Sequence, residues 1–370
     1  MYSVLFSILC GFSTLPGILP AIEQSLPPSI SVDSSTTDTG QVEKTEFVLL
    51  PIFFSSPDTR LAIGILPQIV FRTSSASNPS SVRMDSYYTQ NKQYHLLLRP
   101  RVWLRDNSYS LTGKFSLKKW PTSFYGIGNA STSDKQKFTE QLYESSIEAM
   151  KNIGKGYFTG LNYALRYGKI NPESPEARST LATVSGHGTT LTSSIGFLFR
   201  QDTRDNHFYP RRGDYHTLEF SVASKLMGSD HTFAQFTADF HKYIPIHRSH
   251  VLAVQGLGSV SVGDLPFRLL PSVGSTMRGY SSVRYIDRNL AALQIEYRVA
   301  PLFGRIGFVA FAGVADVFEH PDDLHLDKLK YAVGIGIRYL FSRSKKINIR
   351  LDYGIGRRSS GNYVDLGEAF

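Results

Sequence analysis

The stretch that decides the fold reads Ile347-Asn348-Ile349-Arg350-Leu351-Asp352-Tyr353-Gly354-Ile355. Apolar residues occupy every second position, and the positions between them hold Asn348, Arg350, Asp352 and Gly354. Side chains of a β-strand point alternately to the two faces of a sheet. The stretch therefore predicts a strand with one face in lipid and the other in a watery lumen.

The same alternation recurs along the chain from about residue 46 onward. The alternating segments lie near 46–55, 61–72, 82–91, 93–104, 108–118, 140–150, 157–168, 190–200, 213–223, 232–243, 250–261, 289–299, 305–315, 329–340, 346–355 and 361–370. A soluble β-sandwich also alternates, but its strands average only about five or six residues. These longer segments, even in number, predict an all-β fold, namely a transmembrane antiparallel β-barrel of about 16 strands.

Composition excludes a helical membrane protein. Hydrophobic residues make up 41% of the chain, yet no apolar run after the amino terminus approaches the roughly 20 residues of a transmembrane helix. The 20 Tyr, 24 Phe and 30 Gly favour strands and turns. The net charge of +9 is scattered and forms no concentrated patch. We therefore expect no nucleic-acid partner and interpret the basic residues as lining the lumen.

The amino-terminal region differs from the rest of the chain. Residues 1–21 contain a short apolar run that includes Cys10, and we interpret them as a signal peptide, although no Lys or Arg precedes Lys44. Residues 22–45 are rich in Ser, Thr, Pro and Asp, which predicts a flexible periplasmic linker. The barrel domain is then expected over residues 46–370.

The connections between the segments are of two kinds. If the chain enters from the periplasm, the odd-numbered connections face outward, and the long ones lie at about 119–139, 169–189, 262–288 and 316–328. The even-numbered connections are mostly short. Long outer loops with short periplasmic turns are typical of outer-membrane barrels. The sequence thus predicts a bacterial outer-membrane location, in contact with membrane lipid and lipopolysaccharide.

The most specific motif is Gly274-Ser275-Thr276-Met277-Arg278-Gly279-Tyr280. It resembles the bacterial surface antigen family, the BamA/TamA-type barrels of outer-membrane assembly and transport. In that family an Arg-Gly-aromatic motif lies at the tip of the sixth outer loop, which folds back into the lumen. The resemblance implies that Arg278, Gly279 and Tyr280 fasten this loop inside the barrel. Without the resemblance, Arg278 would be read as an ordinary exposed loop arginine.

Three further stretches carry the resemblance. Asp202, Arg204, Asp205, Pro210 and Gly213 look like the family's turn between the eighth and ninth strands, although a well-capped hairpin would use the same residue types. Pro57-Asp58-Thr59, with Gly64, looks like its first hairpin.

The end of the chain is the third of these stretches. Val364, Leu366 and Phe370 look like the last strand, whose final aromatic is read by the barrel-assembly machinery during biogenesis. The resemblance spans about residues 47–370.

An acidic partner is expected for Arg278, because a guanidinium forms paired hydrogen bonds with a carboxylate. In the segment 289–299, Leu293, Ile295 and Tyr297 would face lipid, so Gln294, Glu296 and Arg298 should face the lumen. Glu296 is the first candidate partner.

The sequence departs from the family in two respects. Many relatives carry an acidic residue in the thirteenth strand where this chain has Phe311, which leaves Glu296, or alternatively Asp239, to bind Arg278. Relatives that insert or secrete proteins also carry polypeptide-transport-associated (POTRA) domains ahead of the barrel, and no such domain fits the residues before the first predicted strand.

No catalytic motif stands out. The ten His are dispersed without an HExxH or Cys/His metal spacing, and the sequence contains neither a GxxxxGK[ST] loop nor a GxSxG elbow. We expect no enzyme activity, no cofactor and no metal site.

The family resemblance implies protein or lipid translocation or assembly at the outer membrane, with an unidentified client protein. It also implies a weak seam between the first and last strands, with which Pro51 is compatible because proline cannot donate a ladder hydrogen bond. Two alternatives stay open. One is a passive anion-preferring porin-like channel, and the other is a surface adhesin acting through the loops at 119–139 and 169–189.

Overall fold

The computed structural model describes residues 45–56, 60–129, 135–343 and 346–370. The predicted signal peptide (1–21), the predicted linker up to residue 44 and the predicted first hairpin tip, Pro57-Asp58-Thr59, lie outside the described residues. Among the described residues, no helix is long and apolar enough to span a membrane.

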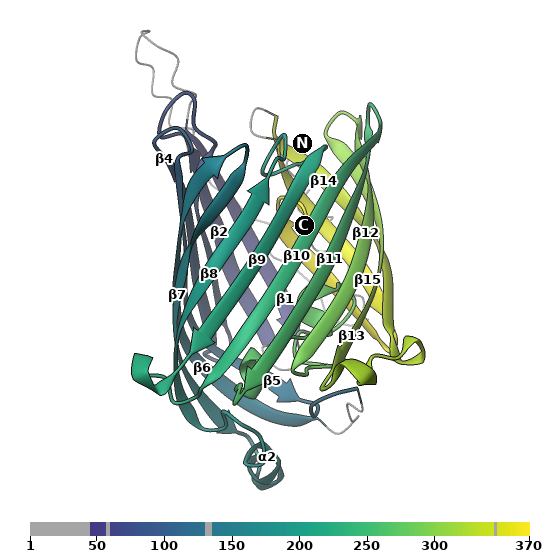
Figure 1. Cartoon of the computed structure of the whole chain (residues 1–370). Helices are drawn as coiled ribbons and strands as arrows, with labels where there is room; N and C mark the ends of the chain where they lie inside the picture. The colour runs from purple at the N-terminus through teal and green to yellow at the C-terminus, as the bar shows by residue number, and fades with distance from the viewer. Residues whose placement is uncertain (1–44, 57–59, 130–134, 344–345) are drawn as a thin grey trace, which may run out of the picture. The chain divides into compact units, whose positions relative to one another are not determined.

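The fold consists of 16 strands in one sheet, arranged in chain order, with each strand antiparallel to the next (Figure 1). The strands are β1 (Glu46–Ser56), β2 (Arg60–Phe71), β3 (Ser80–Thr89), β4 (Tyr94–Leu104), β5 (Tyr109–Phe124), β6 (Gln136–Gly154), β7 (Tyr157–Pro172), β8 (Thr189–Asp202), β9 (Gly213–Ala223), β10 (Phe233–His247), β11 (His250–Gly263), β12 (Asn289–Phe303), β13 (Ile306–Phe318), β14 (Lys330–Ser342), β15 (Ile347–Gly356) and β16 (Ser359–Leu366). The predicted all-β antiparallel barrel is confirmed.

The two faces of the sheet follow the alternation of the sequence. On β14, Tyr331, Val333, Ile335 and Ile337 are exposed on the outer face, whereas Arg338 is buried on the inner face. Apolar side chains exposed along successive strands would be unfavourable in water but suit a lipid environment. The outer face is therefore a lipid-facing belt.

Several strand ends differ from the predicted ones. β5 continues to Phe124 and β6 starts at Gln136, so the long connection expected at 119–139 shrinks to 125–135. The alternation fades there, but pairing continues, because Phe124 and Phe138 turn inward into an apolar cluster. Strand β16 ends at Leu366, four residues before the predicted end at Phe370.

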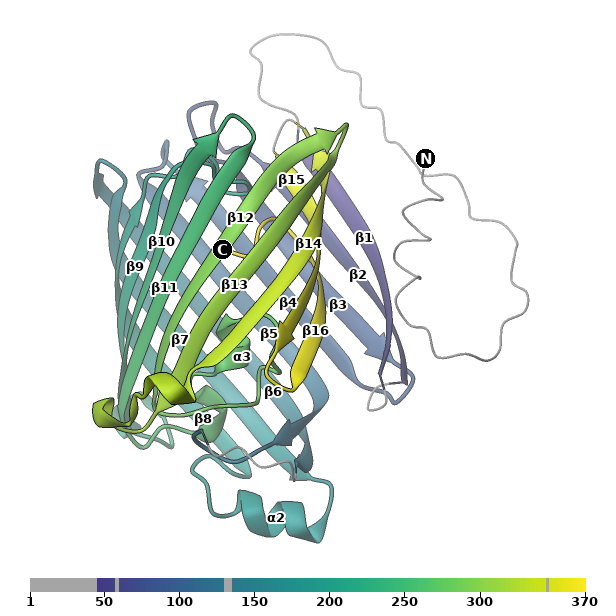
Figure 2. The ribbon, with the colours of Figure 1, turned by 90° about the vertical axis from the view of Figure 1, so that its right-hand side faces the viewer.

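The connections at the two ends of the barrel differ in size. Most even-numbered strands lead into short turns at one end, and the longest connection there covers residues 203–212 after β8. The opposite end carries the longer connections, including those with helices α2 (Pro175–Leu181) and α3 (Val273–Thr276). Figure 2 shows α2 beyond the strand ends and α3 within the ring of strands.

The sheet does not close by backbone pairing. Within the described residues, no ladder joins β1 to β16. Side chains bridge the two edges instead: Val48 of β1 and Val70 of β2 share one buried apolar cluster with Ile347 and Ile349 of β15 and Leu366 of β16. Val48 and Val70 belong to the inner face, whereas Ile347, Ile349 and Leu366 belong to the outer face of their strands, so the last strands pack inside the first ones at this seam.

Candidate functional site: a loop docked in the barrel lumen

The connection between β11 and β12, residues 264–288, turns back into the barrel. Its short helix α3 begins after Ser272, whose hydroxyl accepts hydrogen bonds from the backbone N–H groups of Gly274 and Ser275. A bridge between Ser272 and Ile286 holds the two arms of the loop together. Val273 and Met277 then pack against inward-facing residues of β12–β14, including Leu290, Val317 and Ala332.

Arg278 at the loop tip binds two carboxylates on the barrel wall. Its guanidinium donates to Glu296 of β12 through one terminal nitrogen and to Asp352 of β15 through the other. Both carboxylates have 0% exposed side chains. Hydrogen bonds to a charged partner are strong at such buried positions. The loop tip is thus fastened to two separate strands.

The ring of Phe311 of β13 stacks against the Arg278 guanidinium. The guanidinium carbon lies 3.6 Å from the centroid of the Phe311 ring, which is a cation–π contact. The family departure at this position therefore does not leave Arg278 unsupported: the aromatic ring stacks below it, and Asp352 supplies the second carboxylate.

Arg278 belongs to a network of buried ion pairs. Arg298 donates to Glu296 at 2.7 Å, and Arg338 contacts Asp352 and, at 2.7 Å, Glu368. Arg350 lies 3.8 Å from Asp352, so four guanidiniums contact three carboxylates. Such a network is costly to break because removal of one member leaves buried charge without its partner.

Gly279 and Tyr280 form hydrogen bonds with strands β14 and β16 and with the turn between β15 and β16. The Gly279 N–H donates to the Tyr363 hydroxyl of β16 at 2.8 Å. The Tyr280 hydroxyl donates to the Tyr331 carbonyl at 2.8 Å and accepts from the N–H of Arg357 at 2.9 Å. Gly279 has a φ of +103°, which a residue with a side chain rarely adopts.

Two glycines of β15 make room for the tip. A Cβ added at Gly354 would lie 2.9 Å from the backbone nitrogen of Gly279, and one added at Gly356 would lie 2.5 Å from the Tyr280 ring. The loop backbone therefore rests directly on the strand backbone.

We expect Gly354→Val to lift the loop tip off β15, because the clash falls on backbone atoms that cannot turn aside. The measurement is maleimide labelling of Met277→Cys, which replaces a side chain with 2% exposure, in a Cys10→Ser background. Labelling should rise at least about tenfold. Gly258→Val is the matched control, because a Cβ there meets nothing within 4 Å. Equal labelling in both variants would contradict the close packing.

The part of the same loop around Phe267 and Arg268, here called its outer half, is held at a second site. Glu140 of β6 accepts from Arg268 of the loop at 2.9 and 3.1 Å and from Arg166 of β7 at 2.6 Å, and it pairs with Lys118 of β5 at 2.8 Å. Next to it, Phe267 of the loop packs edge-on against Phe124 and against Phe138. This region belongs to an apolar cluster that also contains Ile170, Leu181, Phe233, Leu265, Leu270 and Ile286. Four loop side chains, Leu265, Phe267, Leu270 and Ile286, therefore pack against the wall at the helix-bearing end of the lumen.

The predicted last strand needs a correction at its end. Val364 is exposed on the outer face and Leu366 joins the seam cluster, but Phe370 does not continue that face. After Gly367, with a φ of +87°, the chain turns into the lumen. Glu368 meets Arg338 there, and the Phe370 ring lies 5.7 Å from the ring of His241. Buried arginines on the lumen side attract this segment inward.

The predicted turn motif lies at the other end of the lumen from α2, between β8 and β9. Arg204 pairs with Asp202, and the Asp205 carboxylate accepts from two backbone N–H groups of the same turn. Gly213 has a φ of +100°. Pro210 is buried in the turn. These contacts are those of a capped turn, and none of these residues touches the loop tip.

Two other residues of this turn contact distant parts of the barrel. Phe208 packs against the seam cluster, and the His207 ring lies 5.4 Å from that of Trp103 of β4. Burial lowers the pKa of His207, so its ring is uncharged near neutral pH. The turn between β8 and β9 thus contacts both the seam cluster and β4.

Glu296 and Arg298 lie on the lumen face, as the sequence predicted. Asp239, the alternative partner, does not contact Arg278. The Asp239 carboxylate accepts from His241 and from Gln255, each at 2.9 Å, and not from Arg278. The partner that was missed is Asp352, although the alternation of 347–355 already put it on the polar face. Glu140 was missed because only the folded loop brings Arg268 to it.

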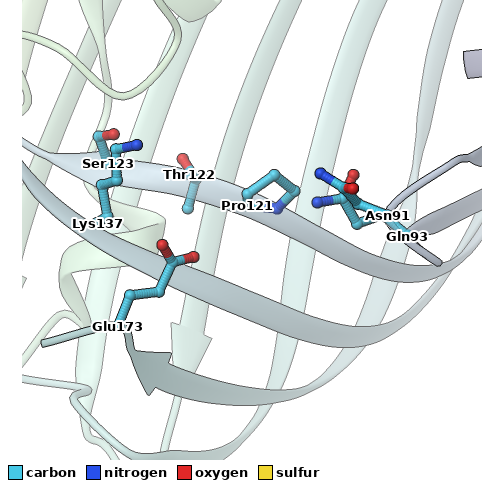
Figure 3. A pocket seen from close by; sticks show the side chains of 7 residues that line it. All are labelled: Asn91, Gln93, Pro121, Thr122, Ser123, Lys137 and Glu173. Atoms are coloured by element: carbon cyan, nitrogen blue, oxygen red, sulfur yellow. The ribbon is translucent and has the colours of Figure 1, made fainter. Parts of the chain in front are cut away.

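A polar hollow of about 270 Å³ lies apart from the docked loop tip, near the ends of β5 and β6 (Figure 3). Its lining is Asn91, Gln93, Pro121, Thr122, Ser123, Lys137 and Glu173. The described residues contain no cluster of His, Cys, Asp and Glu that could hold a metal ion.

A sixteen-stranded sheet with a lipid-facing outer surface and a connection fastened in its lumen defines a transmembrane β-barrel with an internal loop. The Omp85 superfamily domain matches residues 78–370, which is most of the chain. The chain belongs to the Omp85 superfamily.

Solved structures share this fold at low sequence identity. BamA from Haemophilus ducreyi lacking POTRA domains 1–3 is 13% identical, with a TM-score of 0.55, over 87% of this chain and 68% of that one. CdiB from Acinetobacter baumannii is 8% identical, with a TM-score of 0.55, over 87% of this chain and 59% of that one. CdiB from Escherichia coli is 11% identical, with a TM-score of 0.52, over 87% and 61%. This chain thus spans less than two thirds of either CdiB chain. None of the curated proteins matches this chain.

Proposed function

We propose that this protein is an outer-membrane translocation or assembly factor that passes protein or lipid segments through the seam between β1 and β16. Superfamily membership and the likeness to BamA and CdiB barrels support this class of function. Its surroundings would be outer-membrane lipid and lipopolysaccharide, its client is a protein or lipid of that membrane, and the barrel-assembly machinery would act during its biogenesis. The proposal includes no catalytic step.

The observation that carries the proposal is the seam. Each strand from β2 to β15 is paired on both sides, whereas β1 and β16 share no ladder within the described residues. The edges are held by the apolar cluster around Val48 and Leu366 and by an ion pair between Arg83 of β3 and Asp365 of β16. Side-chain contacts of this kind separate at lower cost than a continuous ladder, whose exposed N–H and C=O groups would need new partners.

The loop docked in the lumen favours this route over a passive channel. The loop tip occupies the lumen beside β12–β15, and the Phe267 cluster occupies its helix-bearing end. A porin-like channel needs an aqueous path along the axis. The docked loop lies across this path, whereas the β1 and β16 edges share no ladder within the described residues.

The test is a disulfide across the seam. Val48→Cys with Leu366→Cys, in a Cys10→Ser background, joins two members of the seam cluster. In cells depleted of the native chain, we expect the oxidised double variant to fail to restore the protein and lipid composition of the outer membrane. Reductant and either single variant should restore it. Full restoration by a barrel that a non-reducing gel proves to be locked would rule out lateral opening.

A further inference from the structure

The turns that follow even-numbered strands carry a ring of cations. Figure 1 shows these turns gathered at the end of the barrel opposite α2. The exposed cations in these turns are Arg105, Lys155, Arg212, Arg248, Arg343 and Lys346. The half-buried Arg72 and Arg305 lie in the two remaining turns. Each turn at this end therefore presents positive charge.

The backbone conformation of these turns does not favour lysine or arginine. Arg105, Lys155 and Lys346 have φ values of +50°, +54° and +55°. Such left-handed positions in tight turns favour Gly, Asn or Asp. Turn conformation thus does not explain why lysine and arginine occupy them.

Within the described residues, no carboxylate lies within ion-pair distance of the six exposed side chains. The neighbouring acids are already engaged: Asp106 accepts from the Ser74 hydroxyl, Asp205 accepts from backbone N–H groups, and Asp214 pairs with Lys242 at 3.1 Å. The charges of the six exposed cations are therefore available to an external anion.

The opposite end has a different balance. The exposed cations Lys92, Lys135, Arg178, Lys225, Lys328, Arg357 and Arg358 lie in the connections there, but so do the exposed acids Glu173, Glu176, Asp230 and Asp264 and four more in the connection between β13 and β14. These four are Glu319, Asp322, Asp323 and Asp327. At the turn end, by contrast, the exposed cations outnumber the exposed acids Asp106 and Asp205.

The ring lies immediately beyond the lipid-facing belt. Arg105 follows the exposed Leu104 and its guanidinium lies 5.8 Å from the Tyr109 ring. The exposed Ile153 and Ile246 come two residues before Lys155 and Arg248. Long cationic side chains at this height extend from hydrocarbon to the level of lipid phosphates.

We propose that the turn end of the barrel is a docking surface for the phosphate headgroups of an anionic phospholipid leaflet. The proposal rests on the membrane location in the proposed function but not on translocation through the seam. The ring then selects the lipid at one leaflet and fixes the depth of the barrel in it.

The test is native mass spectrometry of the detergent-solubilised full chain, titrated with phosphatidylglycerol or with phosphatidylcholine. The ring variant combines Arg105→Gln, Lys155→Gln and Arg248→Gln. The matched control removes three exposed cations at the opposite end, through Lys225→Gln, Lys328→Gln and Arg358→Gln. Heat-modifiable gel migration establishes that each variant is folded. Each ring cation removed should weaken phosphatidylglycerol binding roughly fivefold, and the triple variant by about 100-fold.

The expected result is a preference of the native chain for phosphatidylglycerol that is lost in the ring variant and kept in the control. The preference should weaken at high salt and persist when soluble glycerol phosphate competes, because the lipid is also held by its chains. Absence of a preference in the native chain, or equal loss in both triple variants, would overturn the proposal. If the native chain shows neither a folded band nor bound lipid, the membrane location itself would be overturned.

Discussion

Arg278→Ala should release the loop tip and weaken the fold by about 3–5 kcal/mol, because Glu296 and Asp352 would keep buried charges without this cation. In heat-modifiable gel migration, the compact band of the unheated wild type should disappear at a lower temperature in the variant. Limited proteolysis should then cut within residues 264–288, which the native contacts protect.

Two further variants sharpen this test. Arg288→Ala removes an arginine of the same loop whose side chain is 41% exposed, and it should behave like the wild type. Arg278→Lys retains the charge but loses the planar fork that reaches two carboxylates and stacks on Phe311, so it should be intermediate. Fastening of the loop tip by Arg278 is refuted if Arg278→Ala and Arg288→Ala cannot be distinguished.

Glu140→Ala should undock the outer half of the loop. The change leaves Lys118, Arg166 and Arg268 close together with their common carboxylate gone, at a cost of about 3–5 kcal/mol. The guanidinium that draws the loop toward β6 would then repel its neighbours, and the apolar cluster around Phe267 would loosen. Water would enter the helix-bearing end of the lumen.

Conductance in a planar bilayer measures this opening. We expect the wild type to be nearly silent and Glu140→Ala to show frequent openings. Glu144→Ala is the matched control, because Glu144 lies four residues away on the same strand and face, has a partly exposed side chain, and pairs with Lys114 at 2.7 Å while lying 3.9 Å from Arg166. A wild type that conducts steadily with anion preference would instead favour the passive channel.

Much of the architecture could be predicted because alternation is a local property. In the stretch 347–355, period-two spacing alone assigns Asp352 to the lumen face, since a strand has only two faces. The count of such segments and the position of Arg278 between the eleventh and twelfth likewise need no contact between distant residues. The family resemblance then added the expectation that the loop enters the lumen.

The contacts of the loop could not be predicted in the same way. Alternation states the face of a residue but neither its height along the barrel nor the part of the wall that a loop approaches. Asp239 and Asp352 are therefore equivalent candidates by pattern, and only the path of the loop brings Arg278 to Asp352, 74 residues away in the chain.

The sequence by itself thus determined the strands, their two faces, the membrane-compatible belt and the loop that carries the motif, because each depends on side-chain order within a short segment. Only the tertiary structure decided that Phe311 supports the guanidinium, that Glu140 gathers three cations, that Phe370 turns inward and that β1 and β16 meet without a ladder. These features depend on register, curvature and the balance of buried charge across strands that are far apart in sequence, and no short segment contains that information.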